Sequence, residues 1–134
     1  MIIKIKPDIE KAKSMFKLIL NRETSLVFLK KGNFSTVVAE TYYEIIKEIC
    51  NLILLMKGFK SVGENSHKDL FSFLFSKKIF TEEEFRLIDE LRFRRNGSSY
   101  YGKEIKQIYL DNKEKDLMQM IKKLKKLFNS IRRE

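Results

Sequence analysis

Cysteine, proline and glycine are all scarce in this sequence of 134 residues, which contains one cysteine, one proline and five glycines. A single cysteine excludes an intramolecular disulfide and a cysteine-based metal cluster, so a reducing compartment is the natural expectation. The proline and the glycines fall between periodic segments rather than inside them, which is typical of a helical bundle.

Long apolar runs are also missing. The longest, at residues 52 to 56, is far too short to span a bilayer. The opening MIIKIKPDIEKAK has neither the apolar stretch nor the cleavage signature of a signal peptide. We therefore expect a cytoplasmic protein with no membrane contact.

Metal-binding residues are few and dispersed. His67 is the sole imidazole, and the carboxylates show no ligand spacing, so we expect neither a metal site nor a cofactor. Cys50 lies inside the apolar run of residues 45 to 56 and is expected to belong to the core. His67 is the one side chain that titrates near neutral pH, although its place at a helix start favours a structural role.

Positive charge is abundant, because 28 Lys and Arg residues against 18 Asp and Glu residues give a net charge of +10. This balance favours a polyanionic partner, either nucleic acid or an acidic protein. The length suits one domain with one core, so residues 1–134 are treated as a single helical domain.

Apolar spacing predicts an all-α fold, an up-and-down antiparallel bundle of four to five helices without a sheet. The second helix carries apolar residues over more than half of its circumference and should be the central one. Thr81 and Glu84 form a capping box at the start of the fourth helix, and Gly97-Ser98-Ser99 should end or bend that helix. The expected helices cover about residues 8 to 31, 36 to 57, 67 to 77, 82 to 96 and 100 to 131.

Three arginines crowd the end of the fourth helix. They are Arg92, Arg94 and Arg95, which lie within one turn of one another. Their positive charges would repel, so a bridging anion such as phosphate would lower the electrostatic energy of the cluster. Alternatively, they offset the helix dipole and pair with Asp89 and Glu90.

Two tyrosines follow these arginines. Tyr100 and Tyr101 could stack on bases or donate a hydroxyl to a phosphate, although an aromatic residue at a helix start is often core. The last helix is rich in lysine and arginine, which could follow a phosphate backbone or form an ordinary solvated face. These residues are Lys122, Lys123, Lys125, Lys126, Arg132 and Arg133.

The order of three segments resembles the HEPN family of small helical proteins. They are AETYYEIIKEICNLILLMKGFKS, the SHKDL start of the third helix, and IDELRFRRNGSSYYG, within residues 36 to 105. The resemblance implies a homodimeric helical bundle, often encoded beside a minimal nucleotidyltransferase in a toxin and antitoxin arrangement. Many members are metal-independent ribonucleases.

The family's ribonuclease motif is an arginine, a polar residue, a spacer and a histidine. Arg95 and Asn96 match its first half, but Tyr100 stands where the histidine is expected. A phenol with a pKa near ~10 is a poor proton acceptor at neutral pH beside an imidazole near ~6.5. The resemblance therefore implies an anion-binding site at Arg95, Asn96 and Tyr100 whose cleavage motif is degenerate.

Three functions follow from these residues and this resemblance. The first is a HEPN-type dimer that binds RNA or a nucleotide and acts as partner of a minimal nucleotidyltransferase, with Arg92, Arg94 and Tyr101 adding contacts. The second is an active metal-independent endoribonuclease toxin, in which Tyr100 or His67 moves protons. The third is a non-catalytic adaptor whose tyrosines, Tyr100 and Tyr101, could accept a nucleotide from that partner.

Overall fold

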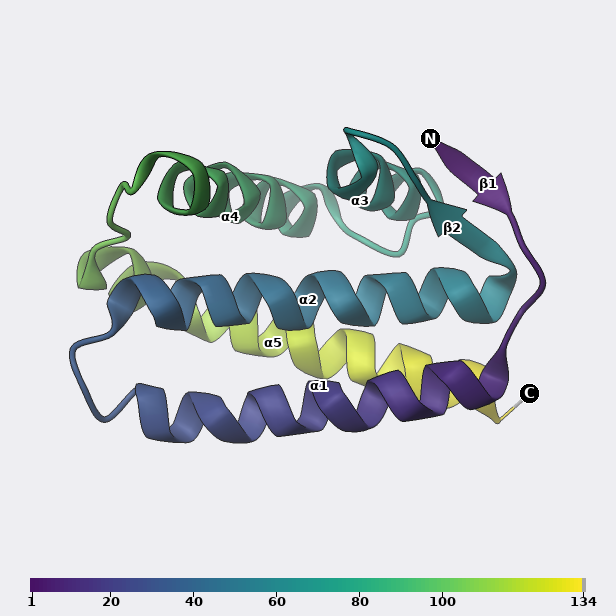
Figure 1. The fold of residues 1–134 in the computed structure, drawn as a ribbon, viewed down its shortest axis with the longest axis horizontal. Coiled ribbons are helices and arrows are strands. Elements are labelled where there is room, and N and C mark those ends of the chain that lie inside the picture. Colours follow the sequence, from purple (N-terminus) through teal and green to yellow (C-terminus); the bar gives the residue numbers. More distant parts are fainter. Residues whose placement is uncertain (134) are drawn as a thin grey trace.

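The computed structural model describes residues 1–133 as five helices and one small antiparallel sheet of two strands (Figure 1). The elements in chain order are β1 (Ile2–Lys4), α1 (Ile9–Leu29), α2 (Ser35–Lys57), β2 (Phe59–Ser61), α3 (Ser66–Ser76), α4 (Glu82–Tyr101) and α5 (Gln107–Arg132).

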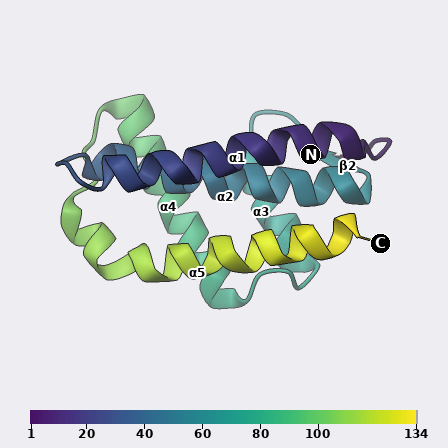
Figure 2. The same cartoon turned by 90° about the horizontal axis from the view of Figure 1, so that it is seen from below.

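Three helices run along the long axis: α1 and α2 are antiparallel, and α5 runs in the direction of α2 (Figure 1). Between α2 and α5, α3 and α4 bring the chain back to the other end of the molecule. Seen from below, α1, α2 and α5 lie side by side, and α3 and α4 cross behind them at a steep angle (Figure 2). The predicted all-α, up-and-down bundle is confirmed.

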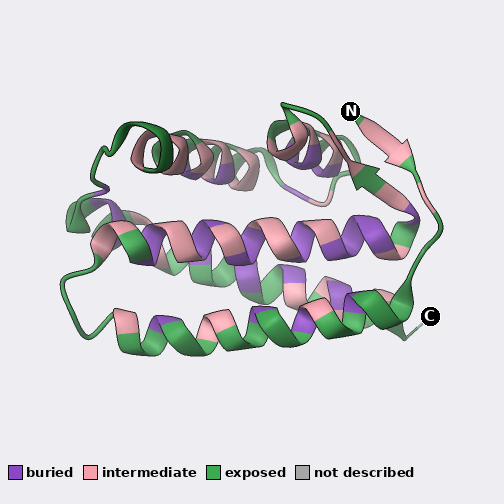
Figure 3. Cartoon of the chain, viewed as in Figure 1, coloured by how far each residue is buried: buried purple, intermediate pink, exposed green. Residues whose placement is uncertain are grey.

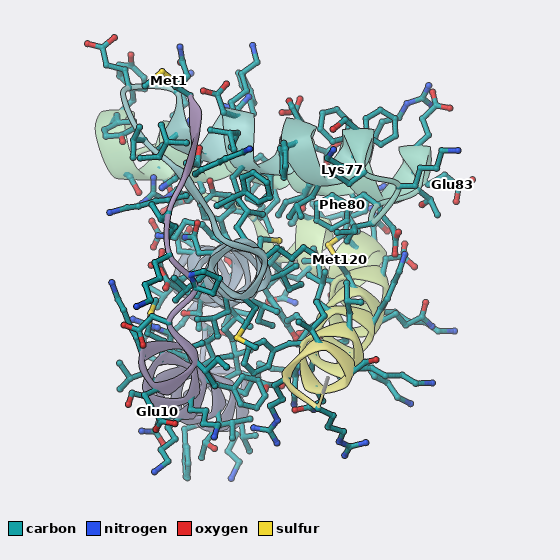
Figure 4. The ribbon with its side chains drawn as sticks, turned by 90° about the vertical axis from the view of Figure 1, so that its right-hand side faces the viewer. Met1, Glu10, Lys77, Phe80, Glu83 and Met120 are labelled. Atoms are coloured by element: carbon teal, nitrogen blue, oxygen red, sulfur yellow. The ribbon has the colours of Figure 1, made fainter. Side chains whose placement is uncertain are left out.

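α2 is the centre of the core, as its apolar surface predicts. Buried residues occur along most of the length of α2, whereas α1 is exposed along its outer side (Figure 3). α1 and α5 flank it below, and α3 and α4 cover it above (Figure 4). In the same view Phe80, from the α3–α4 connection, lies beside Met120 of α5, and both are buried. α2 therefore serves as the scaffold on which the other helices position their polar residues.

Two predicted helix boundaries are wrong, and both lie near the arginine cluster. α4 continues through Gly97 to Tyr101 and ends at Gly102, which has a φ of 66° that favours glycine. The Ser98 hydroxyl lies 2.8 Å from Glu40 Oε2 of α2 and 3.0 Å from the carbonyl oxygen of Arg95, so its single proton either links α4 to α2 or bonds within α4. The last helix accordingly begins at Gln107 rather than near Tyr100.

The side chains of Ser35 and Thr36, at the start of α2, hold the α4–α5 connection. The Ser35 hydroxyl donates to the Ile105 carbonyl at 2.7 Å, and the Ile105 N–H donates to Thr36 Oγ1 at 2.9 Å. This pairing places the end of α4 against the start of α2, where the arginine cluster lies.

The small sheet was not predicted. Ile2 pairs with Ser61, Ile3 with Lys60 and Lys4 with Phe59 in an antiparallel register. Strands of three residues are too short for alternation to show in the sequence.

Cys50 is fully buried and unpaired in α2, and burial raises the pKa of its thiol. This confirms its expected place in the core. Across residues 1–133, none of the helices combines the length and apolar character needed to cross a bilayer.

The capping box at Thr81 is confirmed. The Glu84 N–H donates to Thr81 Oγ1 at 3.1 Å, and the Thr81 N–H donates to Glu84 Oε1 at 2.8 Å. We expect Thr81→Ala to lower the free energy of unfolding by about 1 kcal/mol. The Glu84 N–H loses its acceptor, and the Glu84 side chain is no longer held in place to accept from the N–H of residue 81. Urea unfolding followed by circular dichroism measures this. Thr24→Ala, inside exposed helix α1, is the control and should change stability by less than about 0.5 kcal/mol.

Candidate functional site

The three arginines of α4 do not converge on one point. Arg92 faces its neighbour Asp89, with Nε and Nη2 at 3.2 and 3.0 Å from Oδ1. Arg94 faces α5, with its guanidinium 4.7 Å from the centre of the Tyr109 ring and Nε 3.6 Å from Glu90 Oε1. The proposed pairing with Asp89 and Glu90 is thus present for two of the three arginines.

Arg95 is different, because no carboxylate of residues 1–133 lies within ion-pair distance of its guanidinium. Its Nη1 makes a long hydrogen bond of 3.4 Å to Asn96 Oδ1, and the group lies 5.3 Å from the centre of the Tyr43 ring. The side chain is half-buried. Arg95 therefore lies beside an aromatic face and has no ion-pair partner among these residues.

His67 joins this group from α3. The Tyr43 hydroxyl and His67 Nδ1 are 3.0 Å apart, close enough for a hydrogen bond in either histidine tautomer. Burial lowers the pKa of His67, and the charges of Lys47, Arg95 and Arg92 lower it further against the opposing effect of Glu44. We name Tyr43, Lys47, His67, Arg92 and Arg95 the Arg95 site.

A row of charged residues on α2 forms part of the same surface and was missed in the sequence. Glu40, Glu44 and Glu48 follow one another at every fourth position of an otherwise apolar helix. Glu40 Oε2 accepts from Ser98 at 2.8 Å, while Lys47 Nζ lies 2.7 and 3.4 Å from Glu44 and Glu48. A spacing of four was the available signal, because it places charges on one helix face.

None of these acids forms an ion pair with Arg95, although the charge of Arg95 acts on Glu44. Burial acts to raise the pKa of Glu44, but the hydrogen bond and charge of Lys47, with the charges of Arg22 and Arg95, outweigh it and the pKa is lowered. Glu44 is therefore ionised and held mainly by Lys47. Burial also raises the pKa of the Tyr43 hydroxyl, so it remains a neutral hydrogen-bonding group at physiological pH.

The tyrosines at the end of α4 are solvent-exposed and lie apart from Arg95. Tyr100 is 69% exposed and Tyr101 is 78% exposed, so the alternative that they are core residues is wrong. Because α4 stays helical, the side chain of Tyr100 is turned by about 140° from that of Arg95. Within one chain, the structure brings Arg95 together with Asn96 and His67, but not with Tyr100.

The basic residues of α5 are partly neutralised. Lys123 lies 2.6 Å from Glu84 and Lys125 lies 2.8 Å from Glu23, while the Arg132 guanidinium covers the rings of Phe16 and Phe128. The stripe is therefore discontinuous and lies on a different helix from the Arg95 site.

The residues described contain no group of three His, Cys, Asp or Glu side chains placed to hold a metal ion. No protein-family model, curated protein sequence or solved structure matches this chain significantly. The site is therefore interpreted from its own geometry.

The lowered pKa of His67 predicts a pH dependence. In a nuclear magnetic resonance titration, this single imidazole should titrate below the ordinary value of ~6.5. Because the folded-state pKa is the lower one, stability should be greatest above ~6.5 and fall as the pH drops towards the folded pKa. His67→Gln should flatten that part of the urea-unfolding profile. A midpoint at or above ~6.5 would contradict the burial and charge effects described here.

Proposed function

We propose that the chain is a HEPN-type protein that binds RNA or a nucleotide through the Arg95 site. The observation that carries the proposal is the contrast among the three arginines: Arg92 and Arg94 lie beside carboxylates, whereas Arg95 does not. A phosphate oxygen would supply the charged acceptor that Arg95 lacks, and Asn96 would orient its guanidinium. The net charge of +10 would hasten encounter with a polyanion.

The proposal includes a homodimer in which Tyr100 and Tyr101 belong to the shared surface. Phe93, Gly97 and Tyr100 recur on one side of α4, and both aromatic side chains are largely exposed. Since Tyr100 points away from Arg95 of its own chain, a second copy is needed to bring a tyrosine to that arginine. Light scattering coupled to size-exclusion chromatography tests this step, and a monomer at micromolar concentration would remove it.

RNA binding is tested by fluorescence anisotropy with a labelled single-stranded RNA at low and moderate salt. We expect saturable binding that weakens as salt rises, because phosphate contacts release counterions. Failure to bind at both salt concentrations would overturn the proposed function.

A second candidate, cleavage without a metal, is favoured by one contact. His67 is hydrogen-bonded to Tyr43, whose ring lies against Arg95, so a proton acceptor stands near the cationic group. The lowered pKa keeps this imidazole neutral and able to accept a proton at pH 7. RNA that stays intact in EDTA would eliminate this candidate while leaving binding in place.

The proposed biological setting is a toxin–antitoxin-like pair with a minimal nucleotidyltransferase, and it rests on the family resemblance. A nucleotidyltransferase encoded beside this gene should co-purify with the chain when both are expressed. If complex formation survives nuclease treatment and Arg95→Ala, docking to the transferase does not require the RNA site. Absence of a complex would remove this part of the proposal.

A further inference from the structure

A second surface of the molecule, independent of the Arg95 site, is a groove of about 840 Å³ between α1 and α5. Apolar side chains from three helices line the groove together with several basic side chains, and we call the apolar part its floor. The apolar residues are Leu26 and Val27 of α1, Tyr42 of α2, and Met118 and Ile121 of α5. Seen from below, no helix lies in front of α1 and α5, so this side of the bundle has no covering helix (Figure 2).

Some of these apolar residues are highly accessible. Val27 is 57% exposed and Met118 is 50% exposed. A partner that covers these side chains would remove apolar surface from water, which favours binding. The lining of α5 extends from Met118 to Arg133, which corresponds to about 22 Å of helix. This length suits a helix of about four turns lying along α5.

The charges around the groove are almost all positive. Its lining contains Lys30, Lys122, Lys125, Lys126 and Arg133 against the single acid Glu23. Glu23 already lies 2.8 Å from Lys125, and Lys30 lies 3.2 Å from Glu114. Lys122, Lys126 and Arg133 have no carboxylate of residues 1–133 within ion-pair distance. Within the described part of the chain, these three cations are therefore not engaged in ion pairs.

We propose that this groove binds an acidic amphipathic helix of a partner protein. The apolar face of that helix would cover Val27, Met118 and Ile121, and its acidic flanks would face the three free cations. A second copy of this chain is disfavoured, because a two-fold contact would bring the same cations together. Nucleic acid is disfavoured as well, because the aromatic residue of the floor, Tyr42, is buried with its hydroxyl bonded to Glu114.

The test uses a fluorescein-labelled, helix-stabilised peptide of four turns, with leucines on one face and glutamates on both flanks. Binding to the full chain is followed by anisotropy. A control peptide of the same composition has its leucines distributed around the helix. We expect saturable binding of the first peptide and at least about tenfold weaker binding of the second, because only the first presents one continuous apolar face.

Matched variants locate the binding. Val27→Glu and Lys122→Glu should each weaken peptide binding about tenfold. The first introduces a negative charge among the apolar residues of the groove, and the second replaces a positive charge beside the groove with a negative one. Leu18→Glu is the control for the first, because Leu18 is 55% exposed on α1 but outside the groove. Lys115→Glu is the control for the second, because it changes the same charge on α5 outside the lining.

Other results would overturn the inference. No saturable binding of the amphipathic peptide, or equal binding by all four variants, would exclude an acidic helix as the ligand. A change of oligomeric state in Val27→Glu would assign the groove to a second copy of the chain. Loss of RNA binding in Lys122→Glu without peptide binding would assign it to nucleic acid. Arg95→Ala should leave peptide binding unchanged, which separates this test from that of the proposed function.

Discussion

Arg95→Ala is expected to weaken RNA binding by about tenfold or more, equivalent to at least ~1.4 kcal/mol. The guanidinium is half-buried, lies against the Tyr43 ring and has no carboxylate partner among residues 1–133. A charged hydrogen bond to phosphate would therefore be formed without first breaking an internal ion pair. Removing it loses the full contact and its contribution to counterion release.

Arg94→Ala is the matched control for that measurement. It removes the same charge one position away, but this guanidinium lies over Tyr109 and beside Glu90. We expect a loss of less than about threefold, from the change in net charge alone. Equal losses in both variants would show that RNA senses only the overall charge, and the Arg95 site would then have no specific role.

Phe128→Ala is expected to lower the free energy of unfolding by about 3–5 kcal/mol. Phe128 is fully buried in α5 and its ring centre lies 4.8 Å from that of Phe16 in α1. Truncation leaves a cavity where α1 and α5 meet, and the Arg132 guanidinium loses the ring that it covers. Equilibrium urea unfolding followed by circular dichroism measures the loss. If the alanine variant does not fold, Phe128→Leu should show a smaller loss of the same origin.

Phe28→Ala provides the comparison, because Phe28 is 66% exposed on α1 and lies outside the proposed dimer surface. It should change the free energy of unfolding by less than about 0.5 kcal/mol. A similar loss for the two phenylalanines would show that the loss for Phe128 does not come from a cavity in the core.

The fold was largely predictable because helical spacing dominates this sequence. α2 carries its apolar residues at regular steps, and its central position follows from an apolar surface too wide for one neighbour. The errors arose where tertiary contacts override local signals. α4 continues through Gly97, where the Ser98 hydroxyl lies 2.8 Å from Glu40 Oε2 on α2 and joins the two helices. The sheet depends on pairing between strands 57 residues apart, as in the pair Ile3 and Lys60, and no local pattern reports such a contact.

The site was predictable only in part. The family resemblance identified Arg95 and Asn96, but the distinction between Arg95 and its two paired neighbours required the direction of each side chain. The contact of His67 with Tyr43 could not be predicted, since α3 approaches Tyr43 only in the folded molecule. The resemblance implied a site that includes Arg95 and Tyr100, and within one chain the unbroken helix turns Tyr100 away from Arg95.

The sealed thiol of Cys50 makes this protein well suited to spectroscopic labelling. Cysteine reagents react with the thiolate form of the side chain. Burial keeps reagents away from Cys50, and its raised pKa keeps the thiol protonated. A cysteine introduced at a highly exposed position, such as Phe93→Cys, would therefore be modified selectively without first removing the native one. In the proposed homodimer, spin labels attached there would report the distance between the two copies.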